Sequence, residues 1–361
     1  TNSALAYAYA NKKEFTEFLK FGIDYTIIPH KRLKFLNGNR SNWDYYPTYS
    51  EYENMMKSFA DSFPSICKLH NIGTLSSGRE ILIIQISDNV GQKEDEPSFL
   101  YTSSMHGDEL SGYILSLRLI DYILNGYGNN QRLTDLVNEI DIWINPLANP
   151  DGAYYGGNQD VSDARRYNSN WVDLNRNYGF GWGSDNIGSS PDGCSDTYRG
   201  DSEFSEVETQ IVRDFILDNQ FQNVLHYHSY SNVYIHAYGD GSIPSEPDIS
   251  TLNDIGSEMA RYNGYGVGTG STLIGYTVNG DAVDWTYGDQ GIIAYTPEVG
   301  TPSQGFWPSE NEIIDLCQDQ LHPNKIFAFI SGSDIIIKSY DFSEDLILQE
   351  EEVEIQLLIE N

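Results

Sequence analysis

An imidazole and a carboxylate stand three residues apart in the segment that runs from His106 to Glu109. Side chains of these types can turn toward one point where a strand gives way to a helix. A nitrogen and an oxygen ligand that converge in this way suit a divalent zinc ion. The third ligand has to come from elsewhere, and His228 and its neighbour His226 are available. Two histidines and one glutamate leave a position for water, which is typical of catalytic zinc.

The residue pattern alone leaves the choice between His226 and His228 open. Both lie in the segment 224–228, whose apolar residues predict a strand. Residues two apart in a strand share one face, so the periodicity does not separate a ligand from a structural histidine.

Two further charged residues stand where α/β proteins bind ligands. Arg176 lies in a loop rich in glycine and asparagine, and its planar guanidinium suits a bidentate carboxylate; a surface salt bridge is the alternative. Glu298 follows an expected strand at 292–295, and catalysis in α/β sheets is placed at the carboxyl ends of strands.

Strands and helices alternate along the chain around these residues. The pairs Ser50 with Glu53 and Ser205 with Glu208 predict capping boxes in front of two helices. Strands are expected at 66–72, 80–87, 98–103, 140–144, 224–228, 232–237 and 292–295, and further helices at 110–124, 132–139, 250–262 and 309–329. This alternation predicts an α/β fold with a mixed parallel and antiparallel central sheet and helices on both faces.

The two ends of the chain differ from the middle. We interpret residues 1–42 as an N-terminal arm or the remnant of a pro-segment, with a helix expected at 12–21 and a strand at 25–28. Residues 43–332 form the predicted main domain. Residues 333–361 are acidic and alternate apolar with polar residues, which predicts a short β-rich tail, either the start of a truncated β-sandwich domain or an added edge strand.

The composition excludes some functions. The 361 residues carry 53 acidic and 21 basic side chains and a net charge of −32, so nucleic acid is not an expected partner. No apolar run is long enough to span a membrane. The acidity favours solubility in salty or cold surroundings; calcium binding at 88–96 or 185–196, or attraction of cationic substrates, is the alternative. Three cysteines do not make a disulfide framework.

Taken together, these segments resemble the zinc carboxypeptidases, the family of carboxypeptidases A and T and of the branch with carboxypeptidases D and E. The resemblance covers about residues 46–329. The family's motifs occur in its own order at 106–109 (His-Gly-Asp-Glu), 149–152 (Asn-Pro-Asp-Gly), 173–177 (Asp-Leu-Asn-Arg-Asn), 228–231 (His-Ser-Tyr-Ser) and 276–298.

The resemblance implies roles for the reacting groups. It selects His228 over His226 and implies that one zinc ion is bound by His106, Glu109 and His228. Glu298 would be the general base that takes a proton from water and passes it to the leaving amine. Arg166 would stabilise the oxyanion, and its choice over the adjacent Arg165 depends on the nine-residue step to Asn175.

The resemblance also implies a site for the substrate. The terminal carboxylate would be held by Asn175, Arg176 and Tyr276, which would explain exopeptidase action, since a buried unpaired arginine is costly. Val283 would form the base of the side-chain pocket, where basic-specific members carry aspartate. Asp281 stands where some members of mixed specificity have an acid, so apolar terminal residues are expected first and basic ones second.

Two departures from the family pattern affect the interpretation. Asp108 resembles the branch with carboxypeptidases D and E, whereas the pancreatic branch has arginine there. Cys194 matches a disulfide-bonded cysteine of the pancreatic branch, but the partner position is Ser169, so we expect no disulfide.

The sequence thus predicts a zinc metallocarboxypeptidase that acts on peptide or protein C-termini. By resemblance and acidity it would be secreted, extracellular or periplasmic, and monomeric. Because the chain starts at Thr1 without Met, we expect that an upstream segment has been removed. The alternatives are a peptidase or amidase of peptidoglycan stem peptides and a non-catalytic binding module that kept the fold.

Overall fold

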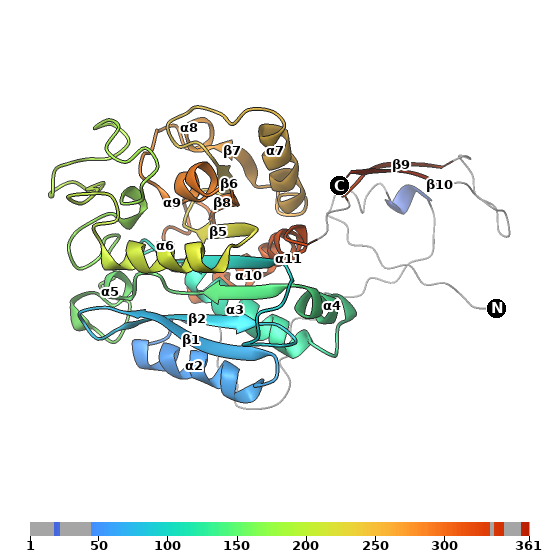
Figure 1. Cartoon of the computed structure of the whole chain (residues 1–361), viewed down its shortest axis with the longest axis horizontal. Coiled ribbons are helices and arrows are strands. Elements are labelled where there is room, and N and C mark those ends of the chain that lie inside the picture. The colour runs from blue at the N-terminus through green and yellow to red at the C-terminus, as the bar shows by residue number, and fades with distance from the viewer. Residues whose placement is uncertain (1–17, 22–44, 333–335, 343–354, 361) are drawn as a thin grey trace.

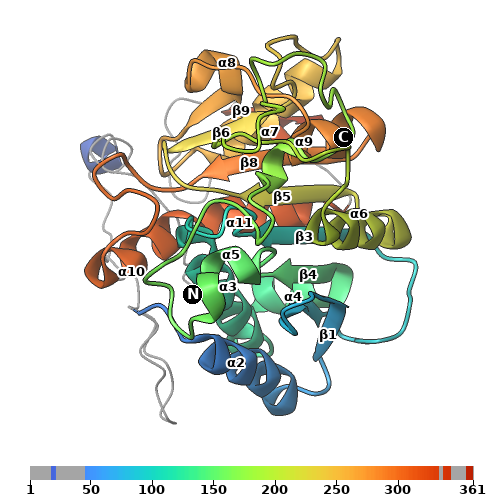
Figure 2. The same ribbon diagram turned by 90° about the vertical axis from the view of Figure 1, so that its left-hand side faces the viewer.

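The computed structural model describes residues 18–21, 45–332, 336–342 and 355–360. A mixed eight-stranded sheet runs through its centre in the order β1-β2-β4-β3-β5-β8-β6-β7 (Figure 1). Its strands are β1 (Cys67–Thr74), β2 (Glu80–Ile86), β3 (Ser98–Ser103), β4 (Asp141–Asn145), β5 (Asn223–Tyr227), β6 (Val233–His236), β7 (Gly266–Thr269) and β8 (Ile293–Glu298). Strands β4, β3, β5 and β8 are parallel neighbours, and Figure 2 shows them one above the other in this order.

Helices cover both faces of the sheet, which confirms the predicted fold class. The longer ones are α2 (Tyr49–Ser62), α3 (Ser111–Gly126), α4 (Gln131–Glu139), α6 (Val207–Asn219), α7 (Asp248–Met259), α10 (Glu310–Asp319) and α11 (Leu321–Ile330). Alternation along β3 sends Leu100 to the core under α6, whereas Phe99 and Tyr101 face the larger core with α2, α3 and α4.

Two predicted helix starts were wrong in detail. Helix α2 is capped by Thr48, whose hydroxyl accepts the Glu51 N–H at 3.3 Å while the Glu51 carboxylate accepts the Thr48 N–H at 2.8 Å. The capping box therefore lies two residues before the predicted one. Helix α6 has Glu206 at its N-cap position without a side-chain cap, and the Ser205 hydroxyl donates to the Glu206 carboxylate at 2.7 Å instead.

The helix expected at 309–329 is two helices. Helix α10 ends at Asp319, and Gln320 lies between it and α11. Pro323 explains the break, because proline has no N–H for the carbonyl four residues earlier and its ring clashes with that carbonyl. Strand β8 extends further than the strand expected at 292–295. Glu298 is therefore the last residue of β8 rather than a residue beyond the strand.

Several shorter elements complete the description. They are α5 (Pro150–Ala153), α8 (Gly270–Leu273), α9 (Ala282–Asp284), the 3-10 helices η1 (Leu19–Phe21), η2 (Tyr155–Gly157) and η3 (Leu174–Arg176), and the π-helical turn η4 (Trp285–Asp289). Of the helix expected at 12–21, the structure describes residues 18–21, of which Leu19–Phe21 form η1, and the strand expected at 25–28 lies outside the described residues. No helix among the described residues is long and apolar enough to cross a membrane.

The C-terminal tail contains β structure, as expected. Strands β9 (Ile336–Phe342) and β10 (Ile355–Glu360) pair antiparallel in a two-stranded sheet of their own and do not extend the main sheet. The domain boundaries at 1–42, 43–332 and 333–361 stay predictions.

Candidate active site

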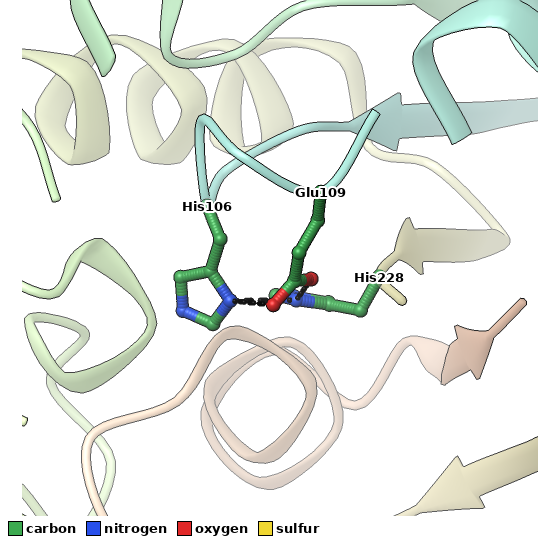
Figure 3. Close-up of side chains that lie close together, drawn as sticks. All are labelled: His106, Glu109 and His228. Atoms are coloured by element: carbon green, nitrogen blue, oxygen red, sulfur yellow. Dashed lines mark hydrogen bonds and ion pairs between the residues drawn. The ribbon is translucent and has the colours of Figure 1, made fainter. Parts of the chain in front are cut away.

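The carboxyl ends of two neighbouring strands bring the expected metal ligands together. His106 and Glu109 lie in the turn between β3 and α3, and His228 directly follows β5. Because β3 and β5 are parallel with Ser103 opposite Tyr227, both strands end at the same edge of the sheet. Figure 3 shows the three side chains converging on one point.

The distances within this group are short. The Glu109 carboxylate lies 2.7 Å from Nδ1 of His106 and 2.8 Å from Nδ1 of His228, and the two Nδ1 atoms are 3.1 Å apart. All three residues are at most 3% exposed. The grouping therefore matches the ligand set that the sequence predicts.

The chemistry of these donors fits a metal cation. Nε2 of His106 lies 2.9 Å from the carboxylate of Asp173, so this nitrogen is assigned the proton and Nδ1 directs a lone pair at Glu109 and His228. Electron-pair donors at this range repel one another unless a cation or a proton lies between them. Burial and Arg166 lower the pKa of His106, but the carboxylates of Glu109 and Asp173 outweigh both and raise it to about 9. The centre therefore attracts positive charge, and a nitrogen and oxygen donor set of this kind suits zinc.

The structure also separates His226 from His228. His226 is buried, and its Nε2 lies 3.0 Å from the hydroxyl of Thr286, which donates to the carbonyl of Ala282 at 2.7 Å. Burial and the neighbouring His228 lower the pKa of His226 to about 3. His226 therefore contacts the segment after α9 and does not belong to the metal-binding group.

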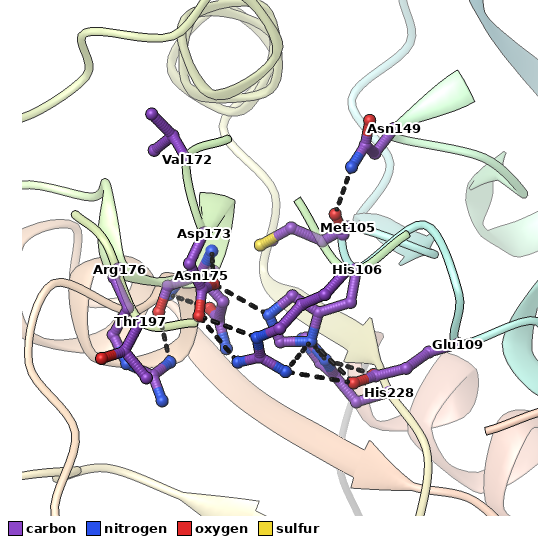
Figure 4. Close-up of polar contacts among 12 residues, drawn as sticks. Met105, His106, Glu109, Asn149, Val172, Asp173, Asn175, Arg176, Thr197 and His228 are labelled. Atoms are coloured by element: carbon purple, nitrogen blue, oxygen red, sulfur yellow. Dashed lines mark hydrogen bonds and ion pairs between the residues drawn. The ribbon is translucent and has the colours of Figure 1, made fainter. Parts of the chain in front are cut away.

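A loop braces the turn that carries two of the ligands. The side-chain amide of Asn149 donates to the carbonyl of Met105 at 3.0 Å, as Figure 4 shows, and its oxygen accepts the Gly152 N–H at 2.8 Å. A Cβ added to Gly107 would lie 2.3 Å from the carbonyl carbon of Gly152. Glycine at 107 thus lets the segment 149–152 pack directly against the turn, and this contact explains why both motifs occur in one chain.

Asp173 connects the metal-binding group to Arg166. It is fully buried and accepts two hydrogen bonds from Arg166, from Nε at 3.0 Å and from Nη2 at 2.7 Å. Figure 4 shows its further contact with His106. Burial raises the pKa of Asp173, but Arg166 and His106 outweigh it and hold the pKa well below its usual range. Nη1 of Arg166 lies 3.6 Å from Glu109, so the predicted oxyanion residue does border the ligands.

The sequence assigned no role to Asp173, although it lies in a quoted motif. An available signal was its place directly before η3, where its carboxylate caps the Asn175 N–H at 3.0 Å. A carboxylate that holds the distal nitrogen of a metal-binding histidine orients the ring and raises its basicity. Asp173 is therefore a positioning residue of this site.

Glu298 lies beside His228 through the backbone. The His228 N–H donates to the carbonyl of Pro297 at 2.9 Å, and the Val299 N–H donates to the carbonyl of His228 at 2.9 Å. Burial and the charge of Glu109 raise the pKa of Glu298 to about 8. A bound cation would offset part of the repulsion from Glu109 and so lower this pKa toward neutral pH. Glu298 would then be a ready acceptor for a proton at neutral pH.

A cavity of about 900 Å³ opens beside these residues. It is lined by Asp108, Ala164, Arg165, Arg166, Tyr167, Arg176, Ile187, Gly188, Asp196, Thr197, Ser271, Gly275, Tyr276, Thr277 and Phe306. The structure thus brings Arg166, Arg176 and Tyr276 to one cavity. Arg176 is 4% exposed, and its Nε donates to the carbonyl of Gly188 at 2.8 Å, whereas Tyr276 is 54% exposed.

Three other predicted substrate residues are half-buried (Asn175) or buried (Asp281 and Val283). Asn175 accepts the Ala282 N–H at 2.9 Å, and Asp281 and Val283 are 5% and 2% exposed. None of the three is among the described residues that line this cavity. Asp281 contacts Asp284, and burial outweighs the attraction of Arg176 and raises the pKa of Asp281 to about 6.

The remaining predicted features are only partly tested. Carboxylates of Asp88, Glu94 and Glu96, in one segment proposed for calcium, lie within 4.8 Å of one another. Calcium binding there stays a prediction. Cys67, Cys194 and Cys317 are free in the structure.

Comparisons with known proteins agree with this geometry. The family model described as zinc carboxypeptidase matches residues 52–322. A zinc carboxypeptidase of Saccharothrix mutabilis subsp. capreolus is 29% identical over 81% of this chain and 72% of its own length, and carboxypeptidase B of Astacus astacus is 28% identical over 80% and 97%. The crystal structure of carboxypeptidase A from Helicoverpa armigera aligns with a TM-score of 0.70 at 27% identity, over 82% of this chain and 76% of that one. The chain therefore belongs to the zinc carboxypeptidase family and is a zinc metallocarboxypeptidase.

Proposed function

We propose that this enzyme removes single residues from the C-termini of peptides, with the terminal carboxylate on Arg176 and the scissile bond at the metal centre. The observation that carries this proposal is the shared cavity: Arg166, which contacts the metal-binding group, and Arg176 line the same wall. Arg176 lines this cavity although it is only 4% exposed. Its guanidinium suits a carboxylate because the planar fork matches both oxygens.

Zinc held by His106, Glu109 and His228 would supply Lewis-acid activation of water and of the peptide carbonyl. Glu298 takes the proton from the attacking water as the water oxygen bonds to the carbonyl carbon. Arg166 stabilises the negative charge that develops on the carbonyl oxygen. Glu298 then returns its proton to the nitrogen as the carbon–nitrogen bond breaks, which releases the terminal residue as an amine.

Exopeptidase action follows from the charge of Arg176. A substrate with an amidated C-terminus, or an internal peptide segment, would bury this guanidinium without an anion, which is costly. Asn175 and the exposed Tyr276 complete the carboxylate site, and the 54% exposure of Tyr276 lets its hydroxyl close over a bound substrate. We propose a broad specificity, with apolar terminal residues first through Val283 and basic ones second through Asp281. Because neither residue lines the cavity, the terminal side chain of the substrate has to open the pocket further to reach them.

The test is the release of terminal residues from N-blocked dipeptides that end in Phe, Leu, Lys, Arg or Glu, with and without a zinc chelator. We expect chelator-sensitive release of Phe and Leu and slower release of Lys and Arg. C-terminally amidated versions should resist cleavage. Arg176→Gln should lower kcat/KM by about 10- to 100-fold, the effect of a lost charged hydrogen bond, whereas Arg213→Gln on α6 should leave it unchanged.

Equal cleavage of free and amidated peptides would contradict the exopeptidase assignment. A zinc-loaded enzyme that cleaves none of the peptides but releases residues from peptidoglycan stem peptides would favour the amidase alternative. Export to an extracellular or periplasmic location, a monomeric state and calcium binding stay proposals, to be tested by fractionation, by light scattering and by metal analysis.

A further inference from the structure

Arg165 lines the same cavity as Arg166 but has different surroundings. Arg166 is held by Asp173, whereas the Arg165 side chain is exposed and its guanidinium lies 5.5 Å from the centre of the Tyr155 ring. Its backbone N–H donates to the carbonyl of Gly152 at 2.9 Å, which fixes the main chain at this point. The result is a cation at the cavity wall whose backbone is anchored and whose head group is accessible.

Among the residues that the structure describes, Arg165 forms no ion pair within 4.0 Å. The chain has 53 acidic and only 21 basic residues, so partners for a guanidinium are abundant elsewhere on it. The described Arg213, for comparison, also lies over an aromatic ring, that of Phe204, but pairs with Asp214 at 2.7 Å. Ion pairs within the described residues therefore do not explain why an arginine stands at position 165.

Three aromatic side chains, which we call the aromatic ridge, form a row that begins at Tyr155, the ring over which the Arg165 head group lies. They are Tyr155, Trp171 and Tyr167, with ring centres 6.2 Å apart for Tyr155 and Trp171 and 5.5 Å apart for Trp171 and Tyr167. Trp171 has a φ of 64°, rare for a bulky residue, and its indole is 52% exposed. The ridge leads from the Arg165 guanidinium to Tyr167, which itself lines the cavity.

The position of this group relative to the metal centre suggests what it meets. If the terminal carboxylate of a substrate is on Arg176 and the scissile bond is at the metal centre, the preceding residues leave along the rest of the cavity wall. That wall includes Arg165, Tyr167 and Phe306. An extended peptide advances about 3.3 Å per residue, so side chains within a few residues of the scissile bond reach this region.

We propose that Arg165 binds an acidic side chain of the substrate upstream of the scissile bond, so that peptides with Glu or Asp there are cleaved preferentially. The guanidinium pairs with the carboxylate, and the aromatic ridge restrains it over Tyr155. This inference rests on the proposed function and deepens it, because it names a selected substrate class rather than a further reaction.

Two acids on the same wall oppose this preference. Asp196 accepts the hydroxyl of Tyr167 at 2.7 Å, and Asp108 lies next to Glu109 and interacts with the charge of Arg166. If these carboxylates dominate the field, a basic side chain would be preferred in place of an acidic one. A preference for acidic substrate side chains would therefore show that Arg165 dominates, and a preference for basic ones that the two carboxylates do.

The experiment uses N-blocked tetrapeptides that end in Phe, with a single Glu placed one, two or three residues before the terminal residue. Each is compared with peptides that carry Gln or Lys at the same place. We expect Glu to give about 2- to 5-fold higher kcat/KM than Gln at one of the positions, the size of an exposed ion pair. This advantage should shrink when the ionic strength rises from 0.05 to 0.5 M.

Arg165→Gln should abolish the advantage of the Glu peptides over the Gln peptides, and Arg213→Gln is the matched control that should keep it. Equal rates for Glu and Gln at all three positions, a preference for Lys, or an advantage that persists in Arg165→Gln would overturn the inference. Cleavage of none of the peptides would instead count against the proposed function, so the two failures are distinguishable.

Discussion

The metal centre and the cavity rim are built in opposite ways. At the metal centre every side chain is held by another: His106 contacts Glu109 and Asp173, and Glu109 contacts His228, all at 2.7–2.9 Å and all at most 3% exposed. At the rim, Tyr276 is 54% exposed and Ile187 is 86% exposed. The first region is fixed by strand ends, and the second belongs to loops.

This difference separates chemistry from selection. A substitution in the interlocked group removes a partner from several others, so its effects on metal binding and on rate should be large and non-additive. A substitution at the rim changes one contact with the substrate and leaves the fold intact. Four variants test how far this separation holds, from the largest expected effect to the smallest.

His228→Ala should abolish zinc binding and lower kcat/KM by about 10³-fold or more, since the metal supplies several kcal/mol of transition-state stabilisation. Elemental analysis and peptide hydrolysis measure both effects. The matched control is His226→Ala, which removes an equally buried imidazole two residues earlier. It should destabilise the protein but keep one zinc per folded chain; loss of zinc there would show that burial, not ligation, is what the site depends on.

Asp173→Asn should weaken zinc binding by about 10- to 100-fold, because the ring of His106 loses the charged group that orients it. Competition with a chelator measures the affinity. Asp151 offers a comparable buried pair with Arg79, at 3.1 Å, outside the metal-binding group. If Asp151→Asn lowered zinc affinity as much as Asp173→Asn, the positioning role of Asp173 would be refuted.

Asp281→Asn tests whether a buried residue that binds no metal is also sensitive to substitution. The pKa of Asp281 is raised from 3.8 to about 6 in the folded protein, so folding favours its protonated form. This carboxyl therefore lowers the stability as the pH rises from about 4 to 6, and the penalty persists above that range. The variant should be more stable than the parent by about 1–3 kcal/mol at pH 8 and equal to it at pH 4.

Urea unfolding at the two pH values measures this difference. Asp289→Asn, at an exposed position of the same segment, is the matched control and should change the free energy of unfolding by less than about 0.5 kcal/mol. An Asp281 variant whose gain in stability is the same at pH 4 and pH 8 would contradict the sign of the shift. The same variant should also lose release of terminal Lys and Arg while keeping that of Leu.

Tyr276→Phe should have the smallest effect. Loss of one hydroxyl that bonds the substrate should raise KM by about 2- to 10-fold, and the free energy of unfolding should stay within about 0.5 kcal/mol because the residue is exposed. Steady-state kinetics and thermal unfolding measure both quantities. Tyr262→Phe, an exposed tyrosine outside the cavity lining, should change neither, and a large loss of stability in Tyr276→Phe would place the rim among the fixed regions.

The sequence predicted the fold class and the pair of His106 with Glu109 because both depend on local signals, whereas the family resemblance supplied His228. Alternating apolar segments identified most strands to within two residues, and the segment 106–109 is short enough to be recognised as it stands. Period-two alternation did not choose between His226 and His228, because the choice depends on which neighbouring segment each side chain meets. Only packing shows that His226 meets Thr286.

Other features were missed for physical reasons that the chain does not display locally. Ser50 and Thr48 are both good capping residues, and the geometry of the chain entering α2 decides in favour of Thr48. The role of Asp173 depends on contacts with residues 67 positions away in the chain. Burial of Asp281 likewise follows from its place at the start of α9 and not from residue type.

The strand order has a consequence for how the protein is made. The Glu109–His228 contact spans 119 positions in sequence, and it exists only once β3 has paired with β5. Before that pairing, the chain offers His106 and Glu109 alone, so a three-ligand site is absent during early folding. Closing so long a loop and pairing parallel strands are slow steps. Zinc therefore binds to all three ligands only after the central sheet has formed. Zinc added to refolding protein should bind late and stabilise the folded state.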